Sequence, residues 1–323
     1  MFVTFNYFLP IITHLKGHLR ISRLQNVAEE DAKAAKLIEK KHLDELVLEE
    51  YASNPSQQKQ RGRIFERLRP HSNLRRLTIV GYGGDRLPDW IGNAVFHRLK
   101  FLHLNEGRNC IKLPPLGQLS LLEHLIIENF YQVETVSLEL YGEHHLSPMR
   151  SFPSLKTLTF RRMWNWKTWS TNEAEISAFP GLEELHVEKC RQLKGSFPLE
   201  LPSLKVLHIE DWSKLYGTLP LSPHLFPSLE KLHVEDCKRL KGGFRVEFPS
   251  LKVLNIKLCR ELCALPQSLP WFPSLEELHV DDCKKLKGGL SPEFPSLKVL
   301  RIRSCKELSG SLIHFHGQHN CVN

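Results

Sequence analysis

The segment FPSLEKLHVEDCKRLKG, residues 226–242, decides the fold because the chain repeats it. Closely related copies occupy residues 179–195 (FPGLEELHVEKCRQLKG) and 272–288 (FPSLEELHVDDCKKLKG). A second, related phrase lies in and beyond the gaps between them, in residues 201–217, 248–264 and 294–310. Successive copies therefore start 22, 25, 22, 24 and 22 residues apart.

A period in the twenties with the form L-x-x-L-x-L-x-x-C-x-x-L is the signature of leucine-rich repeats. One repeat cannot bury its own apolar face, so neighbouring repeats stack around a continuous core. More diverged copies start at Leu74, Leu99, Leu122 and Leu155. We predict an α/β leucine-rich-repeat solenoid, a horseshoe with a parallel β-sheet on its concave side and a mostly irregular convex side.

The regularity of the repeats predicts four segments. These are an N-terminal remnant (1–16), irregular repeats (17–150), regular repeats (151–310) and a tail (311–323). The polar insertions that begin at Tyr141 and Thr171 interrupt the solenoid.

The first irregular repeat has a strand, helix, strand pattern. We expect strands at 19–24 and 43–48, with a helix between them. Asn26 and Glu29 have the spacing of a capping box, which predicts where that helix begins. The polar segment 52–63 contains Gly and Pro and is expected to be a loop.

Cysteines recur at the ninth repeat position, where the chain leaves each predicted strand. They are Cys190, Cys237, Cys259, Cys283 and Cys305, with Phe130, Met163 and Trp212 at the same position elsewhere. A free cysteine is among the most buried residue types, and paired C-x-x-C metal spacing is lacking. We therefore predict buried, reduced thiols. The chain also lacks a usable glycosylation sequon, so we predict a cytoplasmic location.

The formal net charge of +8 comes largely from Lys and Arg pairs scattered among acidic residues. No basic stripe alternates with aromatic residues as strand binding requires, so we do not expect a nucleic-acid partner. The N-terminal segment MFVTFNYFLPII is apolar but short, with no basic residue before it. We expect neither a signal peptide nor a membrane span.

Side chains at alternate strand positions should point to solvent on the concave face. The fifth repeat position reads His186, His208, His233, Asn255, His279 and Arg301. The seventh reads Glu188, Glu210, Glu235, Lys257, Asp281 and Arg303. Histidine beside acid suggests zinc, but a flat ladder offers no closed tetrahedral shell, so we favour a solvated ladder without metal or cofactor. No nucleophile shares this face, which predicts a chain that is not an enzyme.

Aromatic residues raise a similar choice between packing and binding. Exposed tryptophans often anchor a partner, but the spacing of Trp164, Trp166 and Trp169 favours packing of the last two against the adjoining insertion. The repeated Phe-Pro pairs predict phenylalanines that stack along the solenoid. Their phenylalanines are Phe152, Phe179, Phe226, Phe248, Phe272 and Phe294.

Four segments carry a resemblance to a known family. They are residues 17–50 (GHLRISRLQNVAEEDAKAAKLIEKKHLDELVLEE), 67–92 (RLRPHSNLRRLTIVGYGGDRLPDWIG), 112–128 (KLPPLGQLSLLEHLIIE) and 152–169 (FPSLKTLTFRRMWNWKTW). Together they resemble the leucine-rich-repeat region of plant coiled-coil-type nucleotide-binding leucine-rich-repeat (NLR) disease-resistance proteins. The resemblance covers the chain from about residue 17 to residue 310. The chain departs from the family pattern because it lacks the nucleotide-binding G-x-x-x-x-G-K-[ST] loop.

The resemblance implies non-catalytic protein recognition in innate immunity. The implied partners are pathogen effectors, guarded host proteins or the receptor's own nucleotide-binding module. The candidate partner-binding residues on the concave face are His186, Glu188, His208, Glu210, His233, Glu235, Lys257, His279, Asp281, Arg301 and Arg303. One alternative is the substrate-recognition half of an F-box ubiquitin-ligase adaptor, although no F-box segment is evident. An extracellular receptor ectodomain would need a signal peptide, sequons and capping cysteines.

Overall fold

The computed structural model divides the chain into two compact units, Met1–Pro180 and Gly181–Asn323. It describes residues 2–4, 15–51, 58–142, 151–170, 178–194, 197, 200–214, 223–242, 248–264, 272–287 and 295–307. The predicted insertions after Tyr141 and from Thr171, and the tail 311–323, lie outside these residues, apart from Tyr141 and Gly142 themselves.

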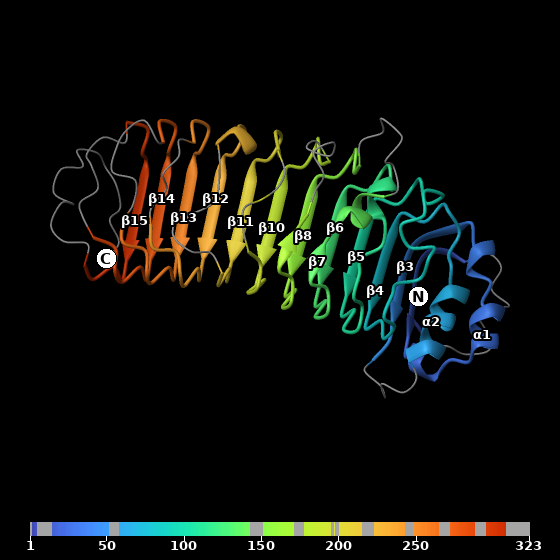
Figure 1. Cartoon of the computed structure of the whole chain (residues 1–323). Helices are drawn as coiled ribbons and strands as arrows, with labels where there is room; N and C mark the ends of the chain where they lie inside the picture. Colours follow the sequence, from blue (N-terminus) through green and yellow to red (C-terminus); the bar gives the residue numbers. More distant parts are fainter. Residues whose placement is uncertain are drawn as a thin grey trace. The chain divides into compact units, whose positions relative to one another are not determined.

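The second unit is a parallel sheet with one strand per repeat, in sequence order (Figure 1). Its strands are β10 (Glu184–Glu188), β11 (Val206–Glu210), β12 (Lys231–Glu235), β13 (Val253–Lys257), β14 (Glu277–Asp281) and β15 (Val299–Arg303). A short 3-10 helix, η7 (Pro223–Leu225), precedes β12. The predicted solenoid built on a parallel sheet is confirmed.

The repeat positions are in register from strand to strand. Leu185 lies opposite Leu207, and Leu207 lies opposite Leu232. These leucines are buried, and the residues on either side of each one face outward. Alternation therefore separates a continuous apolar core from a polar face, as the two-residue period of a strand requires.

Every strand of the second unit ends in the same turn. The residue after each strand has a left-handed backbone, with φ between 48° and 56° from Lys189 to Ser304. After β10–β14, the backbone N–H of this residue donates to the last carbonyl of the next strand, as from Lys189 to Glu210 (2.7 Å) and from Asp211 to Glu235 (2.9 Å). Each turn is therefore completed by the following repeat.

The cysteine position forms part of this turn. The Sγ of Cys190 lies 3.4 Å from the carbonyl oxygen of Glu188, and the Sγ of Cys259 lies 3.4 Å from that of Lys257. Cys190, Cys237, Cys259 and Cys283 are buried free thiols, as predicted. The prediction of burial is wrong for Cys305. Its side chain is half-exposed because β15 is last in the sheet order of the described strands.

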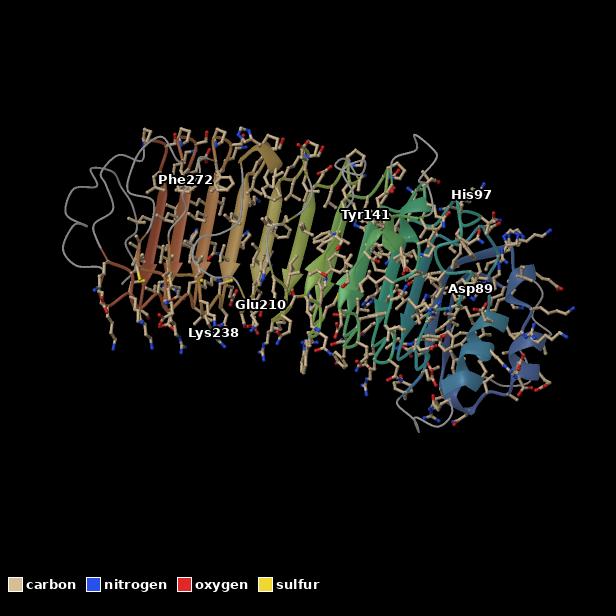
Figure 2. The ribbon with its side chains drawn as sticks, viewed as in Figure 1. Asp89, His97, Tyr141, Glu210, Lys238 and Phe272 are labelled. Atoms are coloured by element: carbon tan, nitrogen blue, oxygen red, sulfur yellow. The ribbon has the colours of Figure 1, made fainter. Side chains whose placement is uncertain are left out.

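The Phe-Pro-Ser phrase joins consecutive repeats on the side where the chain enters each strand. Phe248 and Phe272 are buried and stack, with ring centroids 6.1 Å apart and planes 5° apart. The Ser250 hydroxyl donates to the carbonyl of Pro227 (3.1 Å), one repeat earlier. Figure 2 shows Phe272 near the beginning of the strands and Glu210 near their opposite end. The predicted stacking is confirmed here; Phe294 lies outside the described residues.

The first unit contributes parallel strands in sequence order to the same 13-stranded sheet and also has a small separate pair. Its strands are β1 (Phe2–Thr4), β2 (Lys16–Ser22), β3 (His42–Glu49), β4 (Arg76–Val80), β5 (Phe101–Asn105), β6 (His124–Glu128) and β8 (Thr157–Arg161). The pair is β7 (Thr135–Val136) with β9 (Thr168–Trp169). Its α-helices are α1 (Glu29–Ala34) and α2 (Gln58–Arg67), and its 3-10 helices are Leu24–Asn26, Leu37–Glu39, Leu116–Gln118 and Leu138–Tyr141.

Two predictions for the first unit are wrong. The segment expected to be a loop is helical from Gln58, because α2 buries the side chains of Ile64 and Phe65. The capping box is absent, since α1 begins after Ala28 without a side-chain cap and Asn26 belongs to a 3-10 helix. Within the described residues, no helix is long and apolar enough to cross a membrane.

Two of the three tryptophans are in the core of the first unit. Trp166 and Trp169 are buried with their rings 5.5 Å apart, and each contacts Phe160. The Trp169 indole donates to the Tyr141 hydroxyl (2.7 Å). Trp164 is 53% exposed and has its ring 5.3 Å from that of Tyr131. The predicted burial of Trp166 and Trp169 is therefore confirmed, while any contact with the insertion lies outside the described residues.

Candidate functional site

The outward side chains of β10–β15 form columns that we call the ladder face. The register places His186, His208, His233, Asn255, His279 and Arg301 side by side in one column. Glu188, Glu210, Glu235, Lys257, Asp281 and Arg303 form the second column. The structure thus brings together in two columns the residues that the sequence grouped, although it does not test their role.

Most ladder-face side chains are half-exposed on a fixed backbone. Arg301 and Arg303 are exposed, and Glu188 is buried at 7% exposure. A third outward column, at the start of each strand, alternates Glu184, Val206, Lys231, Val253, Glu277 and Val299. The face therefore combines accessible charge with small apolar areas.

The centre of the ladder face has an acidic character at neutral pH. Burial lowers the pKa of His208 and of His233 below the ordinary value of 6.5, so these imidazoles are neutral at pH 7. His208 and His233 therefore provide no positive charge beside Glu210 and Glu235 at this pH. Lys189 lies 3.1 Å from Glu210 at the edge of the face (Figure 2 labels Glu210).

Past β12 the columns change. Asn255 and Lys257 replace histidine and acid on β13, and a hollow of about 270 Å³ lies beside them, lined also by His208, His233 and Glu235. The Asn255 side-chain oxygen is buried and has no hydrogen-bond partner in the described part of the protein. Buried polar atoms nearly always have a hydrogen-bond partner, so this oxygen is an exception.

A compact group at the start of the ladder face was not predicted. One carboxylate oxygen of Glu188 lies 3.8 Å from the Nδ1 of His186 and 3.9 Å from the Nδ1 of His208. The sequence placed these residues in adjacent columns but gave no reason to expect Glu188 to be buried. The carboxylate lies near imidazoles of two paired strands, an arrangement that depends on distances in space.

Comparison with protein families identifies the repeats. Residues 9–130 match the model described as R13L1/DRL21 leucine-rich repeats. Residues 88–211 match the leucine-rich repeats of RPS2-like plant disease resistance proteins. These two matches cover the irregular repeats and continue into the regular ones.

Individual relatives agree with these matches. The chain is 35% identical over 207 residues to a protein of Arabidopsis thaliana named for disease resistance, covering 60% of this chain and 14% of the relative. It is 34% identical over 202 residues to RPP13-like protein 1 of the same plant, covering 58% of this chain and 19% of the relative. It is 33% identical over 184 residues to disease resistance protein RGA2 of Solanum bulbocastanum, covering 55% of this chain and 19% of the relative.

Solved structures with similar folds are more distant. The leucine-rich-repeat domain of the type III effector XopL is 22% identical, with a TM-score of 0.39, over 59% of this chain and 64% of that domain. A leucine-rich-repeat protein of Leptospira interrogans is 17% identical, with a TM-score of 0.30, over 88% of each chain.

The matched region is a small share of each plant relative. The chain spans about one seventh to one fifth of the length of these relatives. Their names all refer to disease resistance, and the matched family models are both leucine-rich-repeat models. The predicted resemblance is confirmed: the leucine-rich repeats of this chain are similar to those of plant disease-resistance proteins.

Proposed function

We propose that the ladder face is a non-catalytic protein-recognition surface of plant innate immunity, acting in the cytoplasm. Its partners are pathogen effectors, guarded host proteins or the nucleotide-binding module of the receptor itself. The kinship of the repeats with disease-resistance proteins supports the immune setting. None of the relatives named above is a ubiquitin-ligase adaptor, so the F-box alternative is not developed.

The observation that carries this proposal is the fixed register of the two columns of the ladder face. Parallel strands hold equivalent positions about 4.8 Å apart, so the columns form a regular array on a backbone that need not rearrange on binding. Pre-organised side chains lose less conformational entropy when a partner docks. Such a face suits recognition of a protein surface with matching spacing.

The distribution of charge favours a basic partner at the centre. Glu210, Glu235 and Asp281 supply negative charge, while Arg301 and Arg303 lie at the β15 end. A polarised face orients an approaching partner and raises its association rate more than its affinity. The hollow beside Asn255 and Lys257 adds room for a side chain of such a partner.

The test reverses charge on half-exposed residues only. The triple variant Glu210→Lys, Glu235→Lys and Asp281→Lys leaves buried Glu188 intact. The matched control reverses Glu183, Glu230 and Glu276, which pair with Lys205, Lys252 and Lys298 just before the strands and outside the two columns. Both variants change the net charge equally.

Binding to the nucleotide-binding module of a coiled-coil-type plant immune receptor is then measured by titration calorimetry. We expect the ladder-face variant to weaken binding at least tenfold, with a slower association rate, and the control variant to bind as the parent does. Equal binding by parent and ladder-face variant would contradict the proposal for this partner and direct attention to surfaces outside the columns.

A further inference from the structure

We propose that His186, Glu188 and His208 form a binding site for a divalent transition-metal ion, with Zn²⁺ as the best-matched ion. Within the described part of the chain, these three residues form the group whose potential ligand atoms all lie within 4.8 Å of one another. The site joins β10 to β11 and is independent of the recognition role proposed above.

The geometry requires only a modest contraction around an ion. Each imidazole Nδ1 lies just under 4 Å from the same carboxylate oxygen of Glu188. In a tetrahedral zinc site with bonds of about 2.0–2.1 Å, neighbouring ligand atoms are about 3.3 Å apart. Small rotations of the three side chains, which all point to the same side of the sheet, can close this difference.

The carboxylate is placed as a ligand more than as a surface charge. The Glu188 side chain is 10% exposed, against 22% for Glu210 at the equivalent position of the next strand. His186 and His208 flank it from two adjacent strands, with ring centroids 5.7 Å apart. Two imidazoles and a carboxylate that converge from adjacent strands form a ligand set that zinc commonly uses.

A second carboxylate lies behind one of the imidazoles. The Nε2 of His186 lies 3.6 Å from a carboxylate oxygen of Glu184, while its Nδ1 faces Glu188. Metal-bound histidines commonly direct their other ring nitrogen to a carboxylate, which fixes the tautomer and the ring orientation. Glu184 is therefore positioned to orient His186 for binding through Nδ1.

In the described part of the chain, the equivalent column positions form no second group of this kind. On β13 the two positions are Asn255 and Lys257, and Lys257 brings a positive charge. His279 lies 3.1 Å from Glu277 and has Asn255 and Arg301 as column neighbours.

The ladder lacks a fourth protein ligand here, which argued against a closed structural zinc site. Three protein ligands and a water molecule nevertheless make the ordinary open form of zinc coordination, for which two histidines and a glutamate are a known set. The imidazole and carboxylate donors suit Zn²⁺ better than Mg²⁺ or Ca²⁺, which prefer oxygen ligands alone. An ion bound here clamps two neighbouring repeats together.

The experiment titrates Zn²⁺ alone into the untagged full chain by calorimetry. All arms carry His314→Ala, His316→Ala and His319→Ala, because the segment HFHGQHNC (314–321) has its own potential ligands. Accessible thiols are alkylated beforehand for the same reason. We expect one equivalent of Zn²⁺ to bind, and a melting temperature that rises with Zn²⁺ concentration.

Ligand variants locate the site. His186→Ala, His208→Gln and Glu188→Gln should each weaken Zn²⁺ binding by about tenfold or more, while circular dichroism reports that each variant is folded. His279→Ala is the matched control, from the same column but outside the group, and should bind as the parent does. Absence of Zn²⁺ binding by the parent, unchanged affinity in Glu188→Gln, or an equal loss in His279→Ala would each overturn the proposal.

Discussion

The imidazole of His103 on β5 donates a hydrogen bond to Glu128 on β6, with Nε2 2.9 Å from the carboxylate oxygen. Arg161 on β8 lies 3.4 Å from the other oxygen of the same carboxylate. These contacts, led by the His103 hydrogen bond, hold the pKa of Glu128 below its ordinary value of 4.5. A lowered carboxyl pKa stabilises the folded state above about pH 4.5, and that stabilisation is lost as pH falls through the folded pKa.

Replacing Glu128 should therefore have a pH-dependent effect. We expect Glu128→Gln to lower the free energy of unfolding by about 1 kcal/mol at pH 7, and by less as the pH falls below about 4.5. Urea unfolding over this range measures the difference. Glu134→Gln is the control, because the exposed Glu134–Lys167 ion pair stabilises little. A difference that stays constant with pH would show that ionisation of Glu128 is not the cause.

The thiols of the cysteine position should react unequally. A hydrogen bond with Cys283 lowers the pKa of half-exposed Cys305 to about 7, whereas burial raises the pKa of Cys110 to about 12. The thiolate is the reactive form, so we expect iodoacetamide to modify Cys305 with a rate that rises between about pH 6 and pH 8. Buried Cys190 and Cys110 should react only after unfolding. Mass spectrometry of labelled peptides follows each thiol.

Removing the partner thiol tests the cause of this reactivity. Cys283→Ala deletes the hydrogen bond, so the labelling profile of Cys305 should move to higher pH. An unchanged profile would mean that Cys283 does not lower the pKa of Cys305, and a native disulfide between the two residues would contradict the prediction of reduced thiols.

Tryptophans close together in the sequence should differ in their contribution to stability. Trp166→Ala removes a fully buried ring that contacts Phe160 and Trp169, so we expect a loss of about 3–5 kcal/mol. Trp164→Ala removes a ring that is 53% exposed and should change stability by less than about 1 kcal/mol. Thermal and urea unfolding of both variants measure the contrast. Similar losses would show that the Trp164–Tyr131 contact is part of the core.

Much of the second unit could be predicted from the sequence because one physical pattern recurs six times there. The Leu-x-Val or Leu-x-Ile alternation locates β10–β15, and the aligned repeat phrases fix which residues are neighbours across strands. The two columns of the ladder face follow directly from these facts. The burial of Cys190, Cys237, Cys259 and Cys283 follows from the same register.

Features that depend on neighbours in space were missed. The polar residues at the start of α2 led to the prediction of a loop, whereas burial of Ile64 and Phe65 stabilises a helix there. Cys305 occupies the predicted position, yet its exposure depends on where the described sheet ends. The group of His186, Glu188 and His208 could be recognised only from distances between atoms on two strands. Equivalent sequence positions on β12–β14 have other neighbours.

The turn after each strand has a consequence for synthesis of the protein. In the second unit the residue that follows a strand donates its backbone N–H to the carbonyl of the last residue of the next strand. Examples are Asp236 to Lys257 (3.0 Å) and Asp282 to Arg303 (3.1 Å). A ribosome releases the N-terminal repeats first, so each turn can close only after the following strand has emerged. Co-translational folding of this unit therefore trails the growing chain by one repeat, and a pause in translation within a strand leaves the preceding turn open.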